Sequence, residues 1–310
     1  MENADKIYDM LVIGSGPAGL GTALYAARSG ISVLVIEKSP MSGGQIINTT
    51  EVDNYLGLPG IGGFEMGDAF RQHVDKMGAE FVEDEILTVT VDGSVKVAKG
   101  RSGEYRSRTL VFAMGANRSK LGIPGENEYV GKGVSYCATC DGAFFRNKET
   151  VVIGGGDVAV EDAIYLAGIC THVTLVHRRN ELRAARSIQD NLMSKPNVDV
   201  AWDTVSDSVE GSVKVEGLKV HNVKTGEERV IPADGVFIAV GMKPDSELAR
   251  EVCDLDERGY IVAGENCETS TPGIYAVGDI RTKEVRQVIT AVADGACAVS
   301  SAEKYLRNVT

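Results

Sequence analysis

The segment Cys137-Ala138-Thr139-Cys140-Asp141 holds the side chains of this chain that are best suited to redox chemistry. Two thiols separated by two residues can form and break a disulfide, and such pairs often have depressed pKa values that favour exchange. The neighbouring Asp141 can donate or accept the protons that thiol chemistry moves. The segment therefore predicts a redox-active dithiol, and its alternative is a pair of buried, inert cysteines.

The remaining four cysteines are scattered along the chain and are Cys170, Cys253, Cys267 and Cys297. A structural zinc site would need a second pair of ligands near the first, and His172 and His177 lack the usual spacing. We therefore expect no metal site, and we expect the four other cysteines to be ordinary buried or half-buried side chains.

Two Gly-rich segments could each hold the phosphates of a dinucleotide. The first, Gly14-x-Gly16-x-x-Gly19, lies between an apolar stretch and an amphipathic segment from Pro17 to Ser29, which predicts a strand, a turn and a helix. The glycines permit the turn, the close approach of a pyrophosphate and close helix packing. Glu37 follows Gly19 by eighteen residues, where a carboxylate can bind a ribose diol. The alternative is a tight turn with an exposed Glu.

The second loop, Gly154-x-Gly156-x-x-Ala159, is followed at the same distance by basic side chains. Eighteen residues past Ala159 begins a cluster made of His177, Arg178, Arg179 and Arg183. Guanidinium groups hold a 2′-phosphate, which a carboxylate repels. The first site should therefore take a ribose with a free 2′-OH, and the second should prefer NADPH to NADH. The alternative for the basic run is a solvated helix start.

The two loops belong to two copies of one supersecondary unit. Residues 8–37 and 150–179 each show an apolar strand, a Gly-rich turn, an amphipathic helix and a second strand. Apolar runs at 110–117 and 235–244 resemble the final strands of two such domains, and the strand and helix after residue 271 resemble a return to the first. We expect an α/β fold of two Rossmann-like, three-layer domains, in which residues 117–244 are inserted between 1–116 and 245–310.

Taken together, these motifs resemble those of the low-molecular-weight thioredoxin reductases, which are class II pyridine nucleotide-disulfide oxidoreductases. The resemblance covers essentially the whole chain, and CATCDG with HRR-x-x-x-R is its most specific part. The matching segments are GSGPAG (14–19), GGQ (43–45), EVDNYLG (51–57), CATCDG (137–142), GGGDVAVE (154–161), HRRNELRA (177–184), GDI (278–280) and RQVITA (286–291).

The resemblance implies a homodimer that uses NADPH and FAD to reduce thioredoxin or a thioredoxin-like protein. FAD would bind the discontinuous domain, and NADPH would bind the inserted domain, which also carries the cysteine pair. Cys140 would exchange electrons with the flavin, Cys137 would attack the disulfide of the partner protein, and Asp141 would be the acid–base residue.

The resemblance also implies the residues that contact each cofactor. FAD contacts would be Gly14, Ser15, Gly16, Pro17, Ala18, Glu37, Lys38, Gly43, Gly44, Gln45, Asn54, Gly278, Asp279, Arg286, Gln287 and Val288. NADPH contacts would be Gly154, Gly156, Asp157, Val158, Ala159, His177, Arg178, Arg179 and Arg183.

Phe144 and Phe145 follow the cysteine pair in the segment expected to touch thioredoxin, where some relatives carry a larger aromatic in place of Ala143. Exposed aromatics beside a reactive cysteine suit a docking patch, and core packing of one of the two rings is the alternative.

The charge and hydropathy of the chain narrow the classes of partner. A net charge of −12 disfavours nucleic acid and anionic membranes. No apolar run approaches the ~20 residues of a membrane span, and the N-terminus is too polar for a signal peptide, so we expect a cytoplasmic protein.

Several rival functions are less consistent with the motifs. A peroxiredoxin-type reductase usually carries an extra N-terminal redox domain, and a dithiol oxidase has no need of the basic cluster. A relative reduced by ferredoxin should lack one phosphate loop, a ferredoxin–NADP reductase would lack the cysteine pair, and a nucleotide sensor would have no reason to carry CATCD.

Overall fold

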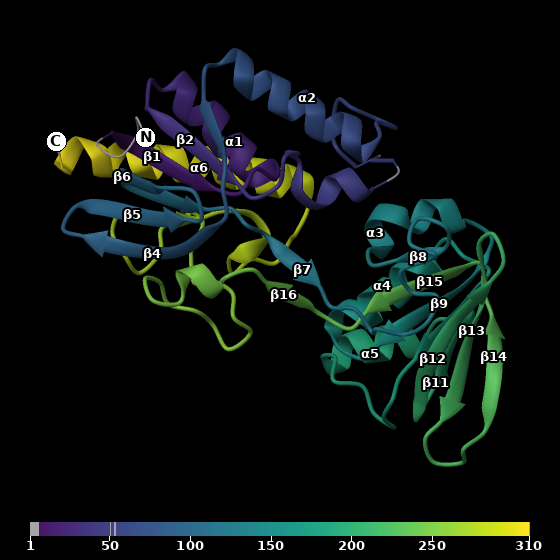
Figure 1. Cartoon of the computed structure of the whole chain (residues 1–310). Helices are drawn as coiled ribbons and strands as arrows, with labels where there is room; N and C mark the ends of the chain where they lie inside the picture. Colours follow the sequence, from purple (N-terminus) through teal and green to yellow (C-terminus); the bar gives the residue numbers. More distant parts are fainter. Residues whose placement is uncertain (1–5, 50, 53, 310) are drawn as a thin grey trace. The chain divides into compact units, whose positions relative to one another are not determined.

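The computed structural model describes residues 6–49, 51–52 and 54–309, which form two compact units (Figure 1). One unit contains the chain up to Asn117 and from Lys243 onward, and the other runs from Arg118 to Met242. The two chain connections between them pair as the short strands β7 (Ala116–Arg118) and β16 (Met242–Pro244). Within the EVDNYLG motif, Asp53 lies outside the described residues.

The first unit is built on a mostly parallel sheet of strand order β3-β2-β1-β6-β5-β4, with β17 paired to β6. Strands β3, β2, β1, β6 and β17 are parallel neighbours, whereas β4, β5 and β6 pair antiparallel. The strands are β1 (Ile7–Ile13), β2 (Val33–Glu37), β3 (Glu80–Glu83), β4 (Ile86–Asp92), β5 (Val95–Gly100), β6 (Glu104–Phe112) and β17 (Ile274–Ala276).

Alternate residues of the central strand β1 face opposite sides of this sheet, and helices α1 and α6 cover one of these sides. Leu11 of β1 packs in one apolar cluster, and Met10 packs in another with residues of α1 and α6. Helices α1 and α6 approach closely, because a Cβ on Gly295 would lie 2.4 Å from the backbone nitrogen of Thr22. The helices are α1 (Pro17–Arg28), η1 (Gly44–Asn48), α2 (Gly63–Lys76), η3 (Glu247–Ala249), η4 (Gly278–Ile280) and α6 (Val288–Val309).

The second unit has a parallel sheet of order β11-β10-β9-β15-β8 and a separate antiparallel sheet, β12-β13-β14. Its strands are β8 (Val134–Ser135), β9 (Glu149–Gly154), β10 (His172–Val176), β11 (Val198–Ala201), β12 (Thr204–Gly211), β13 (Val215–Asn222), β14 (Glu228–Pro232) and β15 (Gly235–Ala239). Its helices are α3 (Ala138–Asp141), η2 (Gly142–Phe145), α4 (Asp157–Ala167) and α5 (Arg186–Met193).

The predicted fold class is confirmed, because β1–α1–β2 and β9–α4–β10 repeat the same parallel unit and one unit interrupts the chain of the other (Figure 1). The first helix ends one residue earlier than expected, with Ser29 as its C-cap. The apolar spacing of the sequence predicts a last helix over roughly residues 287–305. The observed helix continues four residues further, to Val309, because Leu306 and Val309 extend that spacing. Among the described residues, none of the helices has the length and apolar character that crossing a membrane requires.

Candidate active site

The first phosphate loop lies between β1 and α1, and its surroundings require glycine at two positions. A Cβ on Gly19 would lie 1.9 Å from the carbonyl oxygen of Gly14, and one on Gly14 would lie 2.6 Å from that of Ala113. A Cβ on Gly16 would meet only the Cα of Gly44, at 3.8 Å. Gly16 is also the N-cap of α1 and makes no side-chain cap hydrogen bond, so the N–H groups at this helix start can bind a phosphate.

Glu37, at the end of β2, points back at this loop. Its Oε2 accepts hydrogen bonds from the backbone nitrogen and hydroxyl of Ser15, at 2.7 and 2.9 Å, and its Oε1 accepts one from the backbone of Ser39 at 3.0 Å. Lys38, the next residue, is exposed, and its Nζ lies 3.4 Å from a carboxylate oxygen of Asp245. Glu37 therefore orders the loop, and its carboxylate is the kind of group that could bind a ribose diol.

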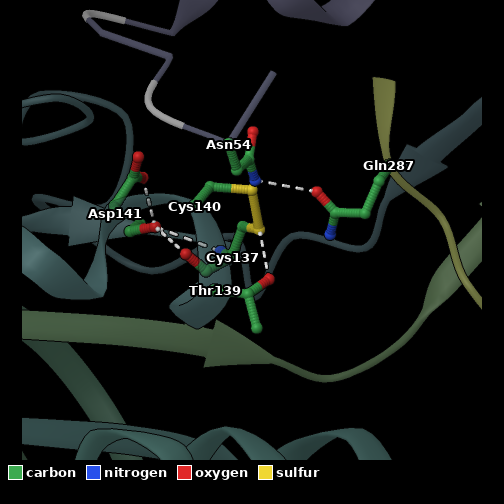
Figure 2. The surroundings of a disulfide bond; sticks show 7 residues. Asn54, Cys137, Thr139, Cys140, Asp141 and Gln287 are labelled. Carbon is green, nitrogen blue, oxygen red and sulfur yellow. Dashed lines mark hydrogen bonds between the residues drawn. A yellow bond between two sulfur atoms is a disulfide. The ribbon is translucent and has the colours of Figure 1, made fainter. Parts of the chain in front are cut away.

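Other predicted flavin contacts come from distant parts of the chain and meet within the first unit. The backbone nitrogen of Gly43 donates to the carbonyl of Ser15 at 2.8 Å. The side-chain amide of Gln45 donates to the carbonyl of Ala116, the first residue of β7. Asn54 Nδ2 donates to Gln287 Oε1 at 3.0 Å (Figure 2). The GGQ segment thus packs on the phosphate loop, and Asn54 is tied to the start of α6.

The remaining predicted contacts of this group lie at helix starts. Pro17 and the buried Ala18 open α1, and the half-buried Val288 opens α6. The Arg286 guanidinium lies 4.3 Å from the ring centre of Tyr260, and its Nη2 donates to the carbonyl of Arg281 at 3.5 Å.

A buried charge cluster, which the sequence reasoning missed, supports the turn that holds Gly278 and Asp279. Asp294 of α6 accepts hydrogen bonds from the backbone of Gly278 at 2.8 Å, from Arg281 at 2.7 and 2.9 Å, and from Lys283 at 2.8 Å. Although burial alone would raise it, the bonds from Arg281 and Lys283 hold the pKa of Asp294 below its ordinary value. In the sequence, the only indication of this cluster is that Asp294 stands among the apolar residues of the last helix.

The second phosphate loop lies between β9 and α4. A Cβ on Gly154 would lie 2.5 Å from the carbonyl oxygen of Ala239, and one on Gly155 would lie 2.1 Å from Cε1 of His177. A Cβ on Gly156, the N-cap of α4, would meet nothing within 4 Å. This last glycine therefore faces open space, as a loop that receives a pyrophosphate requires.

The residues that follow this loop differ in exposure. Asp157 and Val158 begin α4 as exposed side chains, and Ala159 is fully buried. Arg178, Arg179 and Arg183 are exposed, and none of them has a carboxylate partner among the described residues. Three exposed arginines close together in the sequence, with no carboxylate partner among the described residues, suit a phosphate ligand.

Replacing Arg179 and Arg183 together by Ala should raise the KM for NADPH by about 100-fold or more, because charge-assisted hydrogen bonds contribute about 1.5–3 kcal/mol each and every 1.4 kcal/mol is about tenfold. The KM for NADH should change by less than about twofold, since NADH lacks the 2′-phosphate. Steady-state kinetics with both nucleotides measures this. The matched control is Arg186→Ala, because Arg186 is exposed in the same segment but is already paired with Asp190, at 3.1 Å. A parallel loss with both nucleotides would contradict the assignment.

The sequence reasoning grouped His177 with the arginines as a cation, and the structure differs. Its side chain is only 5% exposed, and its Nε2 lies 3.0 Å from the carbonyl oxygen of Glu181. Burial, with the nearby charges of Arg183 and Arg179, lowers the pKa of His177. A neutral ring lies beneath the loop, so the positive charge comes from the arginines.

This lowered pKa makes stability depend on pH. The unfolded chain, whose His pKa is near 6.5, takes up a proton before the folded chain does, so His177 costs stability as the pH falls below about 6.5. Between about pH 7.5 and 5.5 the wild type should therefore lose more unfolding free energy than His177→Gln, which keeps a donor for Glu181. Urea unfolding at each pH measures the two slopes, and equal slopes would contradict the prediction.

Cys137 and Cys140 form a disulfide across the short turn α3, with their Cα atoms 5.3 Å apart (Figure 2). Ser135, at the end of β8, donates to Asp141 Oδ2 at 2.6 Å and accepts the backbone N–H of Cys137 at 3.1 Å. Thr139 Oγ1 lies 3.5 Å from the sulfur of Cys137. The pair is half-buried, and a hydroxyl that no sequence motif had singled out fixes Asp141 beside it.

Of the two aromatic residues that follow the cysteine pair, one is exposed, as a docking patch requires, and the other packs in the core. Phe144 is 42% exposed, whereas Phe145 is buried against Phe237 with ring centres 5.1 Å apart. The four other cysteines are buried or half-buried, as predicted. Burial raises the pKa of Cys253 to about 11 and the pKa of Cys267 to about 12.

The fold and this disulfide define a class of protein. The family described as pyridine nucleotide-disulphide oxidoreductase matches residues 8–295, and the chain belongs to that family. Within the family, thioredoxin reductases are its close relatives. That of Peptoclostridium acidaminophilum is 44% identical over 97% of this chain and 98% of the relative. That of Bacillus subtilis is 43% identical over 98% and 96%.

Solved structures agree with the sequence relatives. The crystal structure of thioredoxin reductase from Streptococcus pyogenes superimposes with a TM-score of 0.92 at 42% identity, covering 99% of this chain and 100% of that one. Thioredoxin reductase from Giardia duodenalis gives a TM-score of 0.92 at 31% identity, covering 98% and 100%. The resemblance inferred from the motifs is therefore confirmed, and membership of the family implies binding of a flavin and a nicotinamide nucleotide.

Proposed function

We propose that the chain catalyses the NADPH-dependent reduction of thioredoxin or a thioredoxin-like protein, with FAD and the Cys137–Cys140 pair as its internal carriers. The observation that carries the proposal is the disulfide across α3, in a chain whose full-length relatives are thioredoxin reductases. FAD belongs to residues 1–116 with 245–310, and NADPH to residues 117–244.

Each loop fits its nucleotide in a different way. The first offers the open Gly16, the start of α1 and the Glu37 carboxylate, which suits a ribose that carries a free 2′-OH. The second offers the open Gly156 with exposed arginines and no acid at the matching strand end. That contrast supports FAD at the first loop and NADPH at the second.

When bound, the nicotinamide and the flavin would supply two electrons, and with two protons these would convert the Cys137–Cys140 disulfide to a dithiol. The Cys137 thiolate then attacks one sulfur of the thioredoxin disulfide, which forms a mixed disulfide and releases a thiolate on thioredoxin. Cys140 attacks the sulfur of Cys137, which releases reduced thioredoxin and restores the internal disulfide. Two electrons pass to thioredoxin, and the internal pair returns to its starting state.

Asp141 is the acid–base residue of this proposal. The Ser135 hydroxyl donates to one carboxylate oxygen, so the other remains available to exchange protons with the cysteine sulfurs and the leaving thiolate. Phe144, four residues after Cys140, supplies an exposed apolar contact for the partner protein.

The direct test of substrate and reductant is NADPH oxidation in the presence of different disulfides. Oxidised thioredoxin should support rapid turnover, whereas glutathione disulfide and lipoamide should not. NADH in place of NADPH should give a much larger KM. Turnover with glutathione disulfide but not with thioredoxin would assign the chain to another branch of its family.

The family resemblance further supports a homodimer, because low-molecular-weight thioredoxin reductases share this organisation. Light scattering of the FAD-loaded protein should give twice the mass of the chain, and a monomer at micromolar concentration would refute this part of the proposal. A reaction that draws on NADPH and thioredoxin also suits the cytoplasm.

A further inference from the structure

The segment that carries the arginines, residues 178–185, is anchored by its backbone to the second phosphate loop. We name this segment the arginine loop. The backbone nitrogen of Arg183 donates to the carbonyl of Gly155 at 2.7 Å, and Gln189 Nε2 donates to the carbonyl of Ala184 at 2.7 Å. The His177 ring contacts the Glu181 carbonyl from below, at 3.0 Å. Much of this anchoring is therefore independent of any carboxylate.

One anchor is a charged side chain. Oδ1 of Asp157 accepts a hydrogen bond from the backbone nitrogen of Ala185 at 2.8 Å. Asp157 is the first residue of α4 and directly follows Gly156, which has open space above it. The carboxylate therefore lies next to the position of the NADPH pyrophosphate and holds the arginine loop two residues beyond Arg183.

An acid at this position needs an explanation. A carboxylate at a phosphate loop repels the phosphates that the loop binds, although it also interacts favourably with the helix N-terminus. The first loop has Pro17 at the equivalent position, which offers no side-chain oxygen, and its carboxylate comes from Glu37 instead. In the first loop, the ordering carboxylate is that of Glu37, at the end of β2. In the second loop, the carboxylate of Asp157 at the helix start holds the arginine loop, and the first loop has no such segment.

We infer that Asp157 is a positioning residue for recognition of the 2′-phosphate, and that it acts through its hydrogen bond to Ala185 rather than through its charge. This inference rests on the proposed NADPH site. The bond fixes the end of the arginine loop next to Arg183, so that the guanidinium is held where the 2′-phosphate binds. Without the bond, ordering of this loop must occur when the nucleotide binds, and affinity for the 2′-phosphate falls.

Three variants separate an effect of the hydrogen bond between Asp157 and Ala185 from an effect of the Asp157 charge. Asp157→Ala removes the acceptor and the charge, Asp157→Asn removes the charge but keeps an acceptor oxygen, and Glu161→Ala removes a charge from the same helix. Glu161 is exposed one turn further along α4 and lies outside both phosphate loops. Because Asp157 is exposed, none of these variants should unfold the chain, and circular dichroism checks this.

Calorimetric titration of the FAD-loaded protein with NADP⁺, NAD⁺ and 2′,5′-ADP measures binding without turnover. Asp157→Ala should weaken binding of NADP⁺ and 2′,5′-ADP by about five- to tenfold, which is the scale of one hydrogen bond to a charged group at an exposed site. NAD⁺ affinity should change by less than about twofold, since NAD⁺ lacks the group that Arg183 contacts. Asp157→Asn should bind all three ligands at least as tightly as the wild type, because it keeps the acceptor oxygen and removes the repulsion of the phosphates. Glu161→Ala should bind them as the wild type does.

Other outcomes overturn the inference in distinguishable ways. An equal loss for NADP⁺ and NAD⁺ would place Asp157 at the pyrophosphate instead, and no loss for either would show that the bond is dispensable. If Asp157→Asn is as impaired as Asp157→Ala, the charge acts and not the hydrogen bond. If the wild type itself fails to bind 2′,5′-ADP, the proposed NADPH site is wrong, and this inference is wrong with it.

Discussion

Replacing Cys137 by Ser should abolish thioredoxin reduction while NADPH still reduces the flavin. The loss should exceed about a thousandfold, because the nucleophile that attacks the partner disulfide is removed and no other thiol replaces it. Cys137 is half-buried at the start of α3, whereas three of the four other cysteines are buried, and burial raises the pKa of each of those three thiols. Flavin absorbance after NADPH addition and a thioredoxin assay measure the two half-reactions separately.

The matched control is Cys170→Ser, which removes a thiol from the same unit. Cys170 is buried and donates to the carbonyl of Phe145 at 3.3 Å, a bond that a serine hydroxyl can keep. This variant should retain wild-type turnover within about twofold. Cys140→Ser should leave Cys137 able to form a mixed disulfide with thioredoxin that nothing resolves. A Cys137→Ser enzyme that still turns over a protein disulfide would contradict the assigned roles.

Replacing Gly19 by Ala should remove bound FAD and destabilise the first unit by about 3 kcal/mol or more, because an added methyl that meets fixed backbone forces the loop apart. Its Cβ would lie 1.9 Å from the carbonyl oxygen of Gly14, which is backbone and cannot rotate away. The purified variant should be colourless, and its thermal transition should fall. Flavin absorbance per chain and calorimetry measure both effects.

Gly264→Ala is the matched control within the same unit. Gly264 is exposed, and the nearest atom to an added Cβ is the flexible Asn266 side chain at 3.6 Å. Stability should change by less than about 0.5 kcal/mol, and the protein should stay yellow. A Gly19→Ala protein with full flavin content would show that the first loop does not hold FAD as proposed.

The sequence was sufficient for the fold class and for the elements that carry the motifs. Strand, Gly-rich turn and helix follow from local periodicity and from glycines whose surroundings admit no side chain, as at Gly19 and Gly154. The cysteine pair was also visible, because its spacing alone limits the distance between the two thiols, and the structure joins them.

The sequence was less informative where the role of a residue depends on distant neighbours. His177 stands among arginines in the sequence, but burial under Gly155 makes it a neutral support. Ser135 and Asp294 are ordinary residues in the sequence, and their partners become clear only when β8 meets α3 and when α6 meets the turn at Gly278. Contacts of this kind depend on tertiary packing, which local patterns do not encode.

The central claim is that NADPH delivers electrons through a bound flavin to the Cys137–Cys140 disulfide. The most direct measurement is an anaerobic titration of the purified, FAD-loaded protein with NADPH, followed in the flavin absorbance bands. We predict that NADPH bleaches the flavin, and that oxidised thioredoxin then restores the yellow colour in the wild type but not in Cys137→Ser. A protein that retains no FAD when FAD is supplied, or a flavin that NADPH does not bleach, would contradict the account.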